Sequence, residues 1–148
     1  MPEITYINQD AITVVGIATK VNLMTNDIAD TVRKYFSEVN TKIPHSINPN
    51  ITYGIYTNYK NDITGKHSEY TYLIGEKVNS TNDISPELTN IILPEQNYVK
   101  FSATQHNVSD VWKNILTTNE LNRSYIADFE VYDTENMTLD IYIGVNNA

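Results

Sequence analysis

The sequence predicts an α+β fold made of two β-α-β-β units that follow one another along the chain. Strand-like and helix-like segments occur in the same order in both halves. Three short stretches of the first half also recur, in order, in the second: residues 28–30 as 108–110, 53–56 as 129–132, and 73–75 as 142–144. Such an internal repeat indicates duplication, and predicts an antiparallel sheet with pseudo-two-fold symmetry and both helices on one face.

The first unit is predicted over about residues 1–79. Residues 12–21 form a strand, and residues 4–7 either begin it or make a short separate strand. A helix starts at a cap on Thr25 or Asn26 and runs to about Val39. Residues 51–59 and 69–78 form a hairpin around a polar turn at 61–65. The apolar positions of the helix fall on one face: Ile28, Val32, Tyr35, Phe36 and Val39.

A Ser-, Thr-, Asn- and Pro-bearing linker is predicted over residues 80–95, and the second unit over about 96–148. Residues 98–103 form its first strand. A helix capped by Asn107 or Ser109 follows. Residues 125–132 and 139–145 close the chain as a hairpin that turns at 134–136. The apolar face of this second helix consists of Val108, Val111, Trp112, Ile115 and Leu116.

Composition excludes several functional classes. The 148 residues carry a formal net charge of −8, and the ten Lys and Arg residues are scattered, which argues against direct nucleic acid binding. Cysteine is absent, so disulfides and thiolate metal sites are excluded. His45, His67 and His106 lack metal-binding spacing, and no glycine-rich phosphate loop or nucleophile motif occurs. We therefore expect no metal or cofactor.

The expected location is the cytoplasm. The N-terminus lacks the basic region and apolar run of a signal peptide, and no apolar run approaches the ~20 residues needed to span a membrane. The chain contains eleven Tyr but three Phe and one Trp. Tyrosine combines an apolar ring with a polar tip, which suits the wall of a ligand pocket as well as the face of a sheet.

The predicted strand at residues 125–132 contains a carboxylate at its centre, Glu130. This side chain either faces water or is held in an apolar interior, where it needs a partner. In the repeat Glu130 occupies the place of Gly54, so one half supplies space and the other a charge. Strand alternation puts Glu130 on the same face as Tyr132, and Gly54 on the same face as Tyr56. That face must line a cavity if Glu130 is functional.

The chain resembles the gyrase-inhibitor-like superfamily of small-molecule-binding domains, which includes effector-binding domains of AraC-type and MerR-type activators. The resemblance rests on six stretches that span nearly the whole chain: residues 15–17, 53–56, 72–75, 98–101, 111–115 and 128–132. It implies a pocket between the halves in which Glu130 is the central glutamate. The candidate ligand-binding residues are Glu130, Tyr53, Tyr56, Tyr72, Phe101, Trp112 and Tyr132.

The leading hypothesis is a standalone binding protein for amphipathic, cationic, aromatic small molecules, because the two repeats leave no segment for a helix-turn-helix. The resemblance also implies an alternative, hydrolysis of strained electrophilic rings, with Glu130 as general base and Tyr56 or Tyr72 as proton donor. A third hypothesis is an interaction module that inhibits a larger protein partner.

Overall fold

The computed structural model describes residues 5–61, 66–118 and 120–146. The strands of this part form one antiparallel sheet in the order β1-β6-β8-β7-β3-β4-β2-β5. They are β1 (Thr5–Gln9), β2 (Ile12–Val21), β3 (Ile51–Lys60), β4 (Glu69–Lys77), β5 (Thr89–Leu93), β6 (Gln96–Ala103), β7 (Arg123–Asp133) and β8 (Thr138–Val145). The helical elements are α1 (Ile28–Lys34), the π-helical turn η1 (Tyr35–Val39) and α2 (Val108–Thr117).

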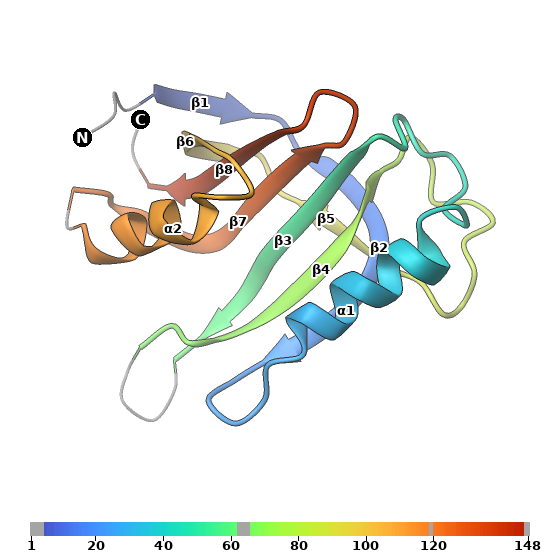
Figure 1. Ribbon diagram of the computed structural model, residues 1–148, viewed down its shortest axis with the longest axis horizontal. Coiled ribbons are helices and arrows are strands. Elements are labelled where there is room, and N and C mark those ends of the chain that lie inside the picture. Colours follow the sequence, from blue (N-terminus) through green and yellow to red (C-terminus); the bar gives the residue numbers. More distant parts are fainter. Residues whose placement is uncertain (1–4, 62–65, 119, 147–148) are drawn as a thin grey trace.

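The sheet is symmetric about its centre, which confirms the predicted fold. Strands β3 and β7 pair with each other, and each is followed outward by its hairpin partner, β4 or β8. The first strand of each unit comes next, β2 on one side and β6 on the other. Both helices lie on the same face of the sheet, α1 over one half and α2 over the other (Figure 1).

The edge strands are exchanged between the units. β1 precedes β2 along the chain but pairs with β6, and β5 precedes β6 but pairs with β2. The predicted linker over residues 80–95 therefore contains a strand that closes the first half of the sheet. The sequence did not predict this strand. Its Thr89 and Asn90 are exposed on the sheet edge, so it lacks the pattern of a half-buried strand.

Two further details differ from the sequence prediction. The first helix is α-helical only as far as Lys34 and continues as a π-helical turn to Val39, in which Tyr35 and Val39 are buried. The N-terminal strand, β1, is separate from β2. The predicted turn at 61–65 falls largely outside the described residues.

The β7–β8 turn follows the sequence prediction. The Asp133 carboxylate accepts hydrogen bonds from the backbone N–H groups of Glu135 and Asn136, both at 3.0 Å. An aspartate that bonds its own backbone two residues on is a common turn initiator. This turn fixes the register of the two strands, and thereby the position of Glu130 in the middle of β7.

Hydrophobic side chains are buried on both faces of the sheet. One cluster packs beneath α1 and η1, and a second beneath α2. A third cluster contains Ile55, Leu73 and Phe129 of the central strands. These residues are next in sequence to ones that face the helices, so their side chains lie on the opposite face of the sheet. Glu76, 1% exposed, anchors η1 to β4, because it accepts hydrogen bonds from the hydroxyls of Tyr35 and Ser46.

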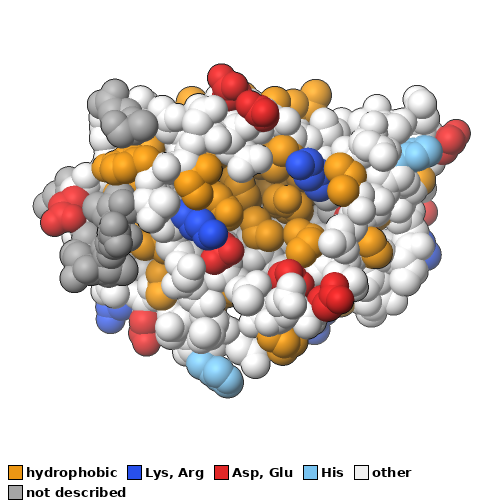
Figure 2. Space-filling view, turned by 90° about the horizontal axis from the view of Figure 1, so that it is seen from above, with side chains coloured by type: hydrophobic (Ala, Val, Ile, Leu, Met, Phe, Trp, Pro, Cys, Tyr) orange, Lys and Arg blue, Asp and Glu red, His pale blue; other side chains and the backbone are white. Residues whose placement is uncertain are grey.

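The basic side chains do not form a patch on the face seen from above (Figure 2). In the view from above, hydrophobic side chains gather in the middle of the face and basic side chains lie apart from one another around them (Figure 2). None of the helices in the described part of the chain is both long and apolar enough to cross a membrane.

The contact between β2 and β4 depends on two glycines that face each other, Gly16 and Gly75. A Cβ atom added to Gly16 would lie 1.8 Å from the backbone oxygen of Ile74. We predict that Gly16→Ala lowers the free energy of unfolding by at least ~2 kcal/mol, because the strands must separate to admit the methyl group. Urea denaturation measures this, with Lys20→Ala on the exposed surface of β2 as control, expected within about 0.5 kcal/mol of wild type. Equal stability of Gly16→Ala and wild type would show that the strands are not held at this spacing.

Candidate functional site

Glu130 lies at the centre of the sheet. It pairs with Gly54 of β3 on one side and with Ile141 of β8 on the other. Its side chain is 4% exposed, so the interior alternative left open by the sequence is the correct one. A Cβ atom on Gly54 would lie 2.8 Å from the Tyr72 hydroxyl and 3.5 Å from Glu130 Oε1. The glycine thus makes room for a tyrosine hydroxyl beside the carboxylate.

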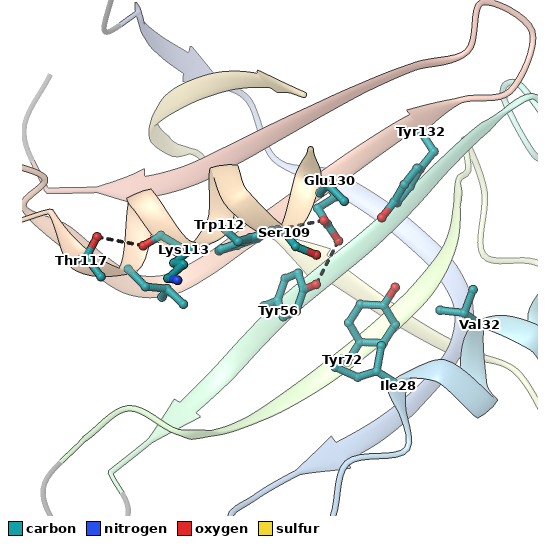
Figure 3. Close-up of a pocket in the computed structure, with 12 residues that line it drawn as sticks. Ile28, Val32, Tyr56, Tyr72, Ser109, Trp112, Lys113, Thr117, Glu130 and Tyr132 are labelled. Atoms are coloured by element: carbon teal, nitrogen blue, oxygen red, sulfur yellow. Dashed lines mark hydrogen bonds between the residues drawn. The ribbon is translucent and has the colours of Figure 1, made fainter. Parts of the chain in front are cut away.

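Both oxygens of the carboxylate accept a hydrogen bond from an aromatic residue. Trp112 Nε1 on α2 donates to Oε2 at 2.9 Å, and the Tyr56 hydroxyl on β3 donates to Oε1 at 2.9 Å (Figure 3). Hydrogen bonds, rather than a basic side chain, therefore satisfy the buried charge within the described part of the chain. The three residues come from β7, α2 and β3, so the contacts join a helix to the seam between the two units.

Burial dominates the electrostatics of this group. Desolvation raises the pKa of Glu130, and the hydrogen bonds from Trp112, Tyr56 and Tyr132 offset part of that rise. Burial and the Glu130 charge together raise the pKa values of Tyr56 and Tyr72 above the ordinary value of a tyrosine. Both hydroxyls stay protonated near neutral pH, and that of Tyr56 donates its proton to a hydrogen bond with the carboxylate.

A cavity of about 580 Å³ opens beside Glu130, between the two helices and the sheet. The two α1 residues that line it each have a repeat equivalent in the lining: Ile28 corresponds to Val108 of α2, and Val32 to Trp112. On the sheet, Tyr56 and Tyr132 form such a pair. The full lining is Ile28, Val32, Tyr56, Tyr72, Val108, Ser109, Trp112, Lys113, Leu116, Thr117, Glu130 and Tyr132.

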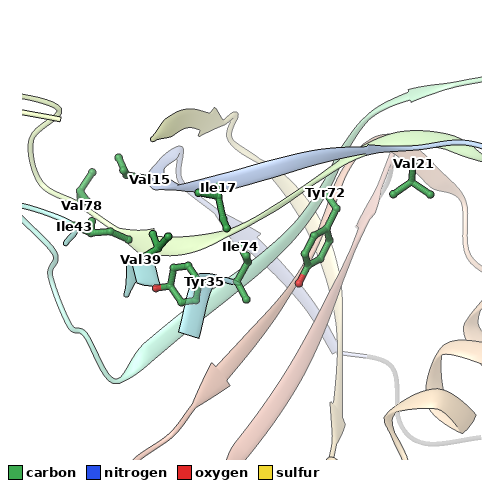
Figure 4. Close-up of a cluster of buried hydrophobic side chains, with 9 residues drawn as sticks. All are labelled: Val15, Ile17, Val21, Tyr35, Val39, Ile43, Tyr72, Ile74 and Val78. Carbon is green, nitrogen blue, oxygen red and sulfur yellow. The ribbon is translucent and has the colours of Figure 1, made fainter. Parts of the chain in front are cut away.

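The aromatic wall of the cavity is held in place from behind. The Tyr56 ring centroid lies 5.3 Å from that of Trp112 and 5.2 Å from that of Tyr72, both edge to face. Tyr72 is 2% exposed and belongs to the cluster beneath α1, where it packs with Ile74 and Tyr35 (Figure 4). Rings fixed in this way offer a preformed surface rather than one that must be ordered when a ligand enters.

Five of the seven predicted site residues meet at this cavity: Glu130, Tyr56, Tyr72, Trp112 and Tyr132. Tyr53 and Phe101 lie elsewhere. Tyr53 points to the opposite face of the sheet, where its ring centroid is 5.9 Å from that of Phe129. Phe101 packs beneath α2 and borders a separate cavity of about 770 Å³ between α2 and the outer strands β1 and β6.

Some lining residues were not among the predicted site residues. Ile28 and Val32 come from α1, and their signal in the sequence was the apolar face of the helix together with the repeat, which pairs Val32 with Trp112. Lys113 is exposed at the rim and gave no such signal. Among the described residues, no group of three or more His, Cys, Asp or Glu side chains is placed to hold a metal ion.

The lining of the 580 Å³ cavity differs in character from that of the cavity beside Phe101. The lining is mainly apolar and aromatic, and Glu130 is its acidic residue. A buried carboxylate attracts a positive charge through a medium of lower dielectric constant than water, and ring faces add cation–π attraction. The 770 Å³ cavity lacks this feature, since Lys100 on its rim pairs with Asp140 at 3.6 Å and no acidic residue is among its described lining residues.

Three solved structures share the fold. The integron cassette protein VCH_CASS2, from the mobile metagenome of Vibrio cholerae, is 22% identical over 98% of this chain and 97% of its own, with a TM-score of 0.75. SAV2435, solved with bound tetraphenylphosphonium, is 20% identical over 98% and 94% of the two chains, with a TM-score of 0.72. A protein from Staphylococcus aureus MU50, named for bacterial transcription regulation, is 18% identical over 98% and 99%, with a TM-score of 0.69.

No curated protein sequence matches the chain significantly. A family match nevertheless covers almost its whole length and confirms the predicted gyrase-inhibitor-like resemblance. Residues 4–145 match the Cass2 family, described as integron-associated effector binding protein, and the chain belongs to this family.

Proposed function

We propose that this protein binds lipophilic aromatic cations in the cavity between α1 and α2. Glu130 is the counter-charge, and Trp112, Tyr56, Tyr72 and Tyr132 form the walls. The observation that carries the proposal is the burial of Glu130, 4% exposed, at the base of an aromatic cavity where the uncharged donors of Trp112 and Tyr56 satisfy it. The tetraphenylphosphonium bound by SAV2435, a protein of the same fold, supports this class of ligand.

The energetics allow binding of a cation that has no hydrogen-bond donors. Trp112 and Tyr56 each donate a hydrogen bond to Glu130, so the buried carboxylate is not left without donors when the ligand supplies only charge. Two opposite charges 4 Å apart attract each other by about 4 kcal/mol in the effective dielectric near a protein surface. Each ring adds about 0.5–2 kcal/mol of cation–π attraction. A site of this kind selects charge and flat apolar shape, so it accepts several related compounds.

The geometry supports binding better than hydrolysis. A general base needs a free lone pair directed at a water molecule. Each Glu130 oxygen already accepts one hydrogen bond, which leaves fewer lone pairs for a water molecule and offsets part of the rise in the pKa of the carboxyl group. The Tyr56 proton is itself directed at Glu130 rather than at a leaving group. For these reasons we place hydrolysis second.

Removal of the charge tests the role of Glu130. We predict that Glu130→Gln weakens tetraphenylphosphonium binding about tenfold or more, ~1.4 kcal/mol, because the amide keeps the size of the side chain and loses its charge. Trp112 is the single tryptophan, so its fluorescence reports the titration directly. Glu95→Gln, on the exposed surface, is the matched control and retains wild-type affinity. Equal affinities of the Glu130→Gln and control proteins would refute the assignment of Glu130 as counter-charge.

Cation binding depends on pH through the same group. The pKa of Glu130 is raised by burial, so the carboxylate takes up a proton at a higher pH than an exposed glutamate. The ionised form binds the cation, and affinity therefore falls as the pH is lowered through this pKa, by up to tenfold per pH unit below it. Calorimetric titrations from pH 8 to pH 4 measure the profile. A flat wild-type profile, indistinguishable from that of Glu130→Gln, would contradict the prediction.

Lys113 opposes the ligand at the rim of the cavity. Its ammonium group is exposed and screened by water, whereas Glu130 is buried, so the carboxylate dominates. We predict that Lys113→Gln strengthens cation binding about twofold to fivefold at low ionic strength, and that the gain disappears in 1 M salt. Lys42→Gln, which changes the net charge equally beyond the end of η1, serves as control. A gain of the same size in the control would attribute the effect to net charge alone.

A further inference from the structure

A second cavity, of about 670 Å³, adjoins the Glu130 cavity. The two have four lining residues in common, namely Ile28, Tyr56, Trp112 and Leu116. Since each of these side chains borders both spaces, the cavities form two compartments of one groove between the helices. We call them the Glu130 compartment and the Arg123 compartment, each after one charged residue of its lining.

An aromatic wall runs through both compartments. The ring centroids of Trp112 and Tyr56 are 5.3 Å apart, those of Tyr56 and Tyr70 are 5.6 Å apart, and those of Tyr70 and Tyr59 are again 5.6 Å apart. Tyr59 and Tyr70 line the Arg123 compartment, together with the apolar side chains of Val21 and Leu23. An apolar group that leaves the Glu130 compartment therefore meets a continuous apolar and aromatic surface.

The two compartments differ in the charged groups that line them. Arg123 lines the second compartment, and no described residue of that lining is acidic. Asp128, the partner of Arg123, is fully buried behind it and accepts hydrogen bonds from the Arg123 guanidinium at 2.6 Å and from the Tyr59 hydroxyl at 2.5 Å. The Arg123 Nε is buried and has no hydrogen-bond partner among the described residues. This compartment thus presents a neutral to positive surface.

We infer that the groove selects elongated ligands with one cationic end, placed at Glu130, and an uncharged apolar end, placed in the Arg123 compartment. Compounds with a cation at both ends are disfavoured. The inference rests on the proposed function. It adds a second binding compartment and a fixed orientation of the ligand, with its charged end at Glu130. A second positive group would have to lose water beside a guanidinium, with no carboxylate to compensate it.

A matched pair of ligands tests the polarity. Decyltrimethylammonium and decamethonium share a ten-carbon chain and a quaternary head group, and only decamethonium carries a second head group. Calorimetry of the wild-type protein is expected to show the single-headed compound binding at least about tenfold more tightly. Equal or tighter binding of decamethonium overturns the inference.

A carboxylate added to the Arg123 compartment should improve the binding of ligands with two cationic ends. Asn26 lines the Arg123 compartment, and its side-chain oxygen accepts a hydrogen bond from the backbone N–H of Ile28 at 3.2 Å, which an aspartate preserves. Asn26→Asp should improve decamethonium affinity relative to decyltrimethylammonium by about threefold, the size of an exposed ion pair. The control is Asn48→Asp, whose side chain makes the same kind of backbone contact, to Asn50, at 2.9 Å. An unchanged ratio in Asn26→Asp, or an equal change in the control, counts against the second compartment.

Failure of the proposed function gives a different result. If decyltrimethylammonium binds wild type and is weakened by Glu130→Gln, the Glu130 site stands and only the comparison with decamethonium decides the polarity. If neither compound binds, or Glu130→Gln binds both as well as wild type does, the proposed function and the inference both fall.

Discussion

The site depends on the pairing of β3 with β7 at the centre of the sheet. This pairing joins the two units, and it sets Gly54 directly opposite Glu130. The positions are equivalent in the repeat, so the pseudo-two-fold axis passes between them. Near such an axis a symmetric protein would carry the same residue twice. Two glutamates would repel each other, and two glycines would leave no charge. The difference between Gly54 and Glu130 creates a single charged position in a symmetric groove.

The cost of burying that carboxylate is spread over several elements. Taking a carboxylate out of water costs several kcal/mol, and each hydrogen bond to a charged group returns about 1.5–3 kcal/mol. Trp112 and Tyr56 supply such bonds, from α2 and from β3. The docking of α2 on the sheet is therefore coupled to the charge of Glu130. A ligand that stabilises the ionised carboxylate also stabilises this contact between helix and sheet. Its binding would therefore raise the free energy of unfolding of the protein.

The sequence predicted the architecture well because duplication leaves its signal in several places. The order of the helices and strands, the recurrence of residues 53–56 at 129–132, and the hairpin turn at Asp133 agree with the structure. The predicted apolar helix faces agree only in part, because Phe36 and Leu116 are exposed. The strand β5 was missed, because an edge strand with exposed Thr and Asn has no hydrophobic alternation. Its pairing with β2 is a long-range contact, which local sequence does not encode.

The site residues likewise fall into those that local sequence patterns place correctly and those that depend on the tertiary arrangement. Glu130, Tyr56 and Tyr132 share one face of the central strands, so alternation was sufficient to place them together. The same rule puts Tyr53, next to Gly54, on the opposite face, where it packs against Phe129. Phe101 faces α2 from the outer side, and only the position of the helix over the sheet separates it from the cavity. The Arg123 compartment depends on side chains from loops and strands far apart in sequence, and had no sequence signal.

A crystal structure of the protein with tetraphenylphosphonium tests the central claim most directly. The account predicts that the phosphonium lies in the Glu130 compartment, with phenyl groups against Tyr56, Tyr72 and Trp112 and with the Trp112 and Tyr56 hydrogen bonds to the carboxylate intact. A cation bound instead in the cavity beside Phe101, or on the opposite face of the sheet near Tyr53, would contradict it.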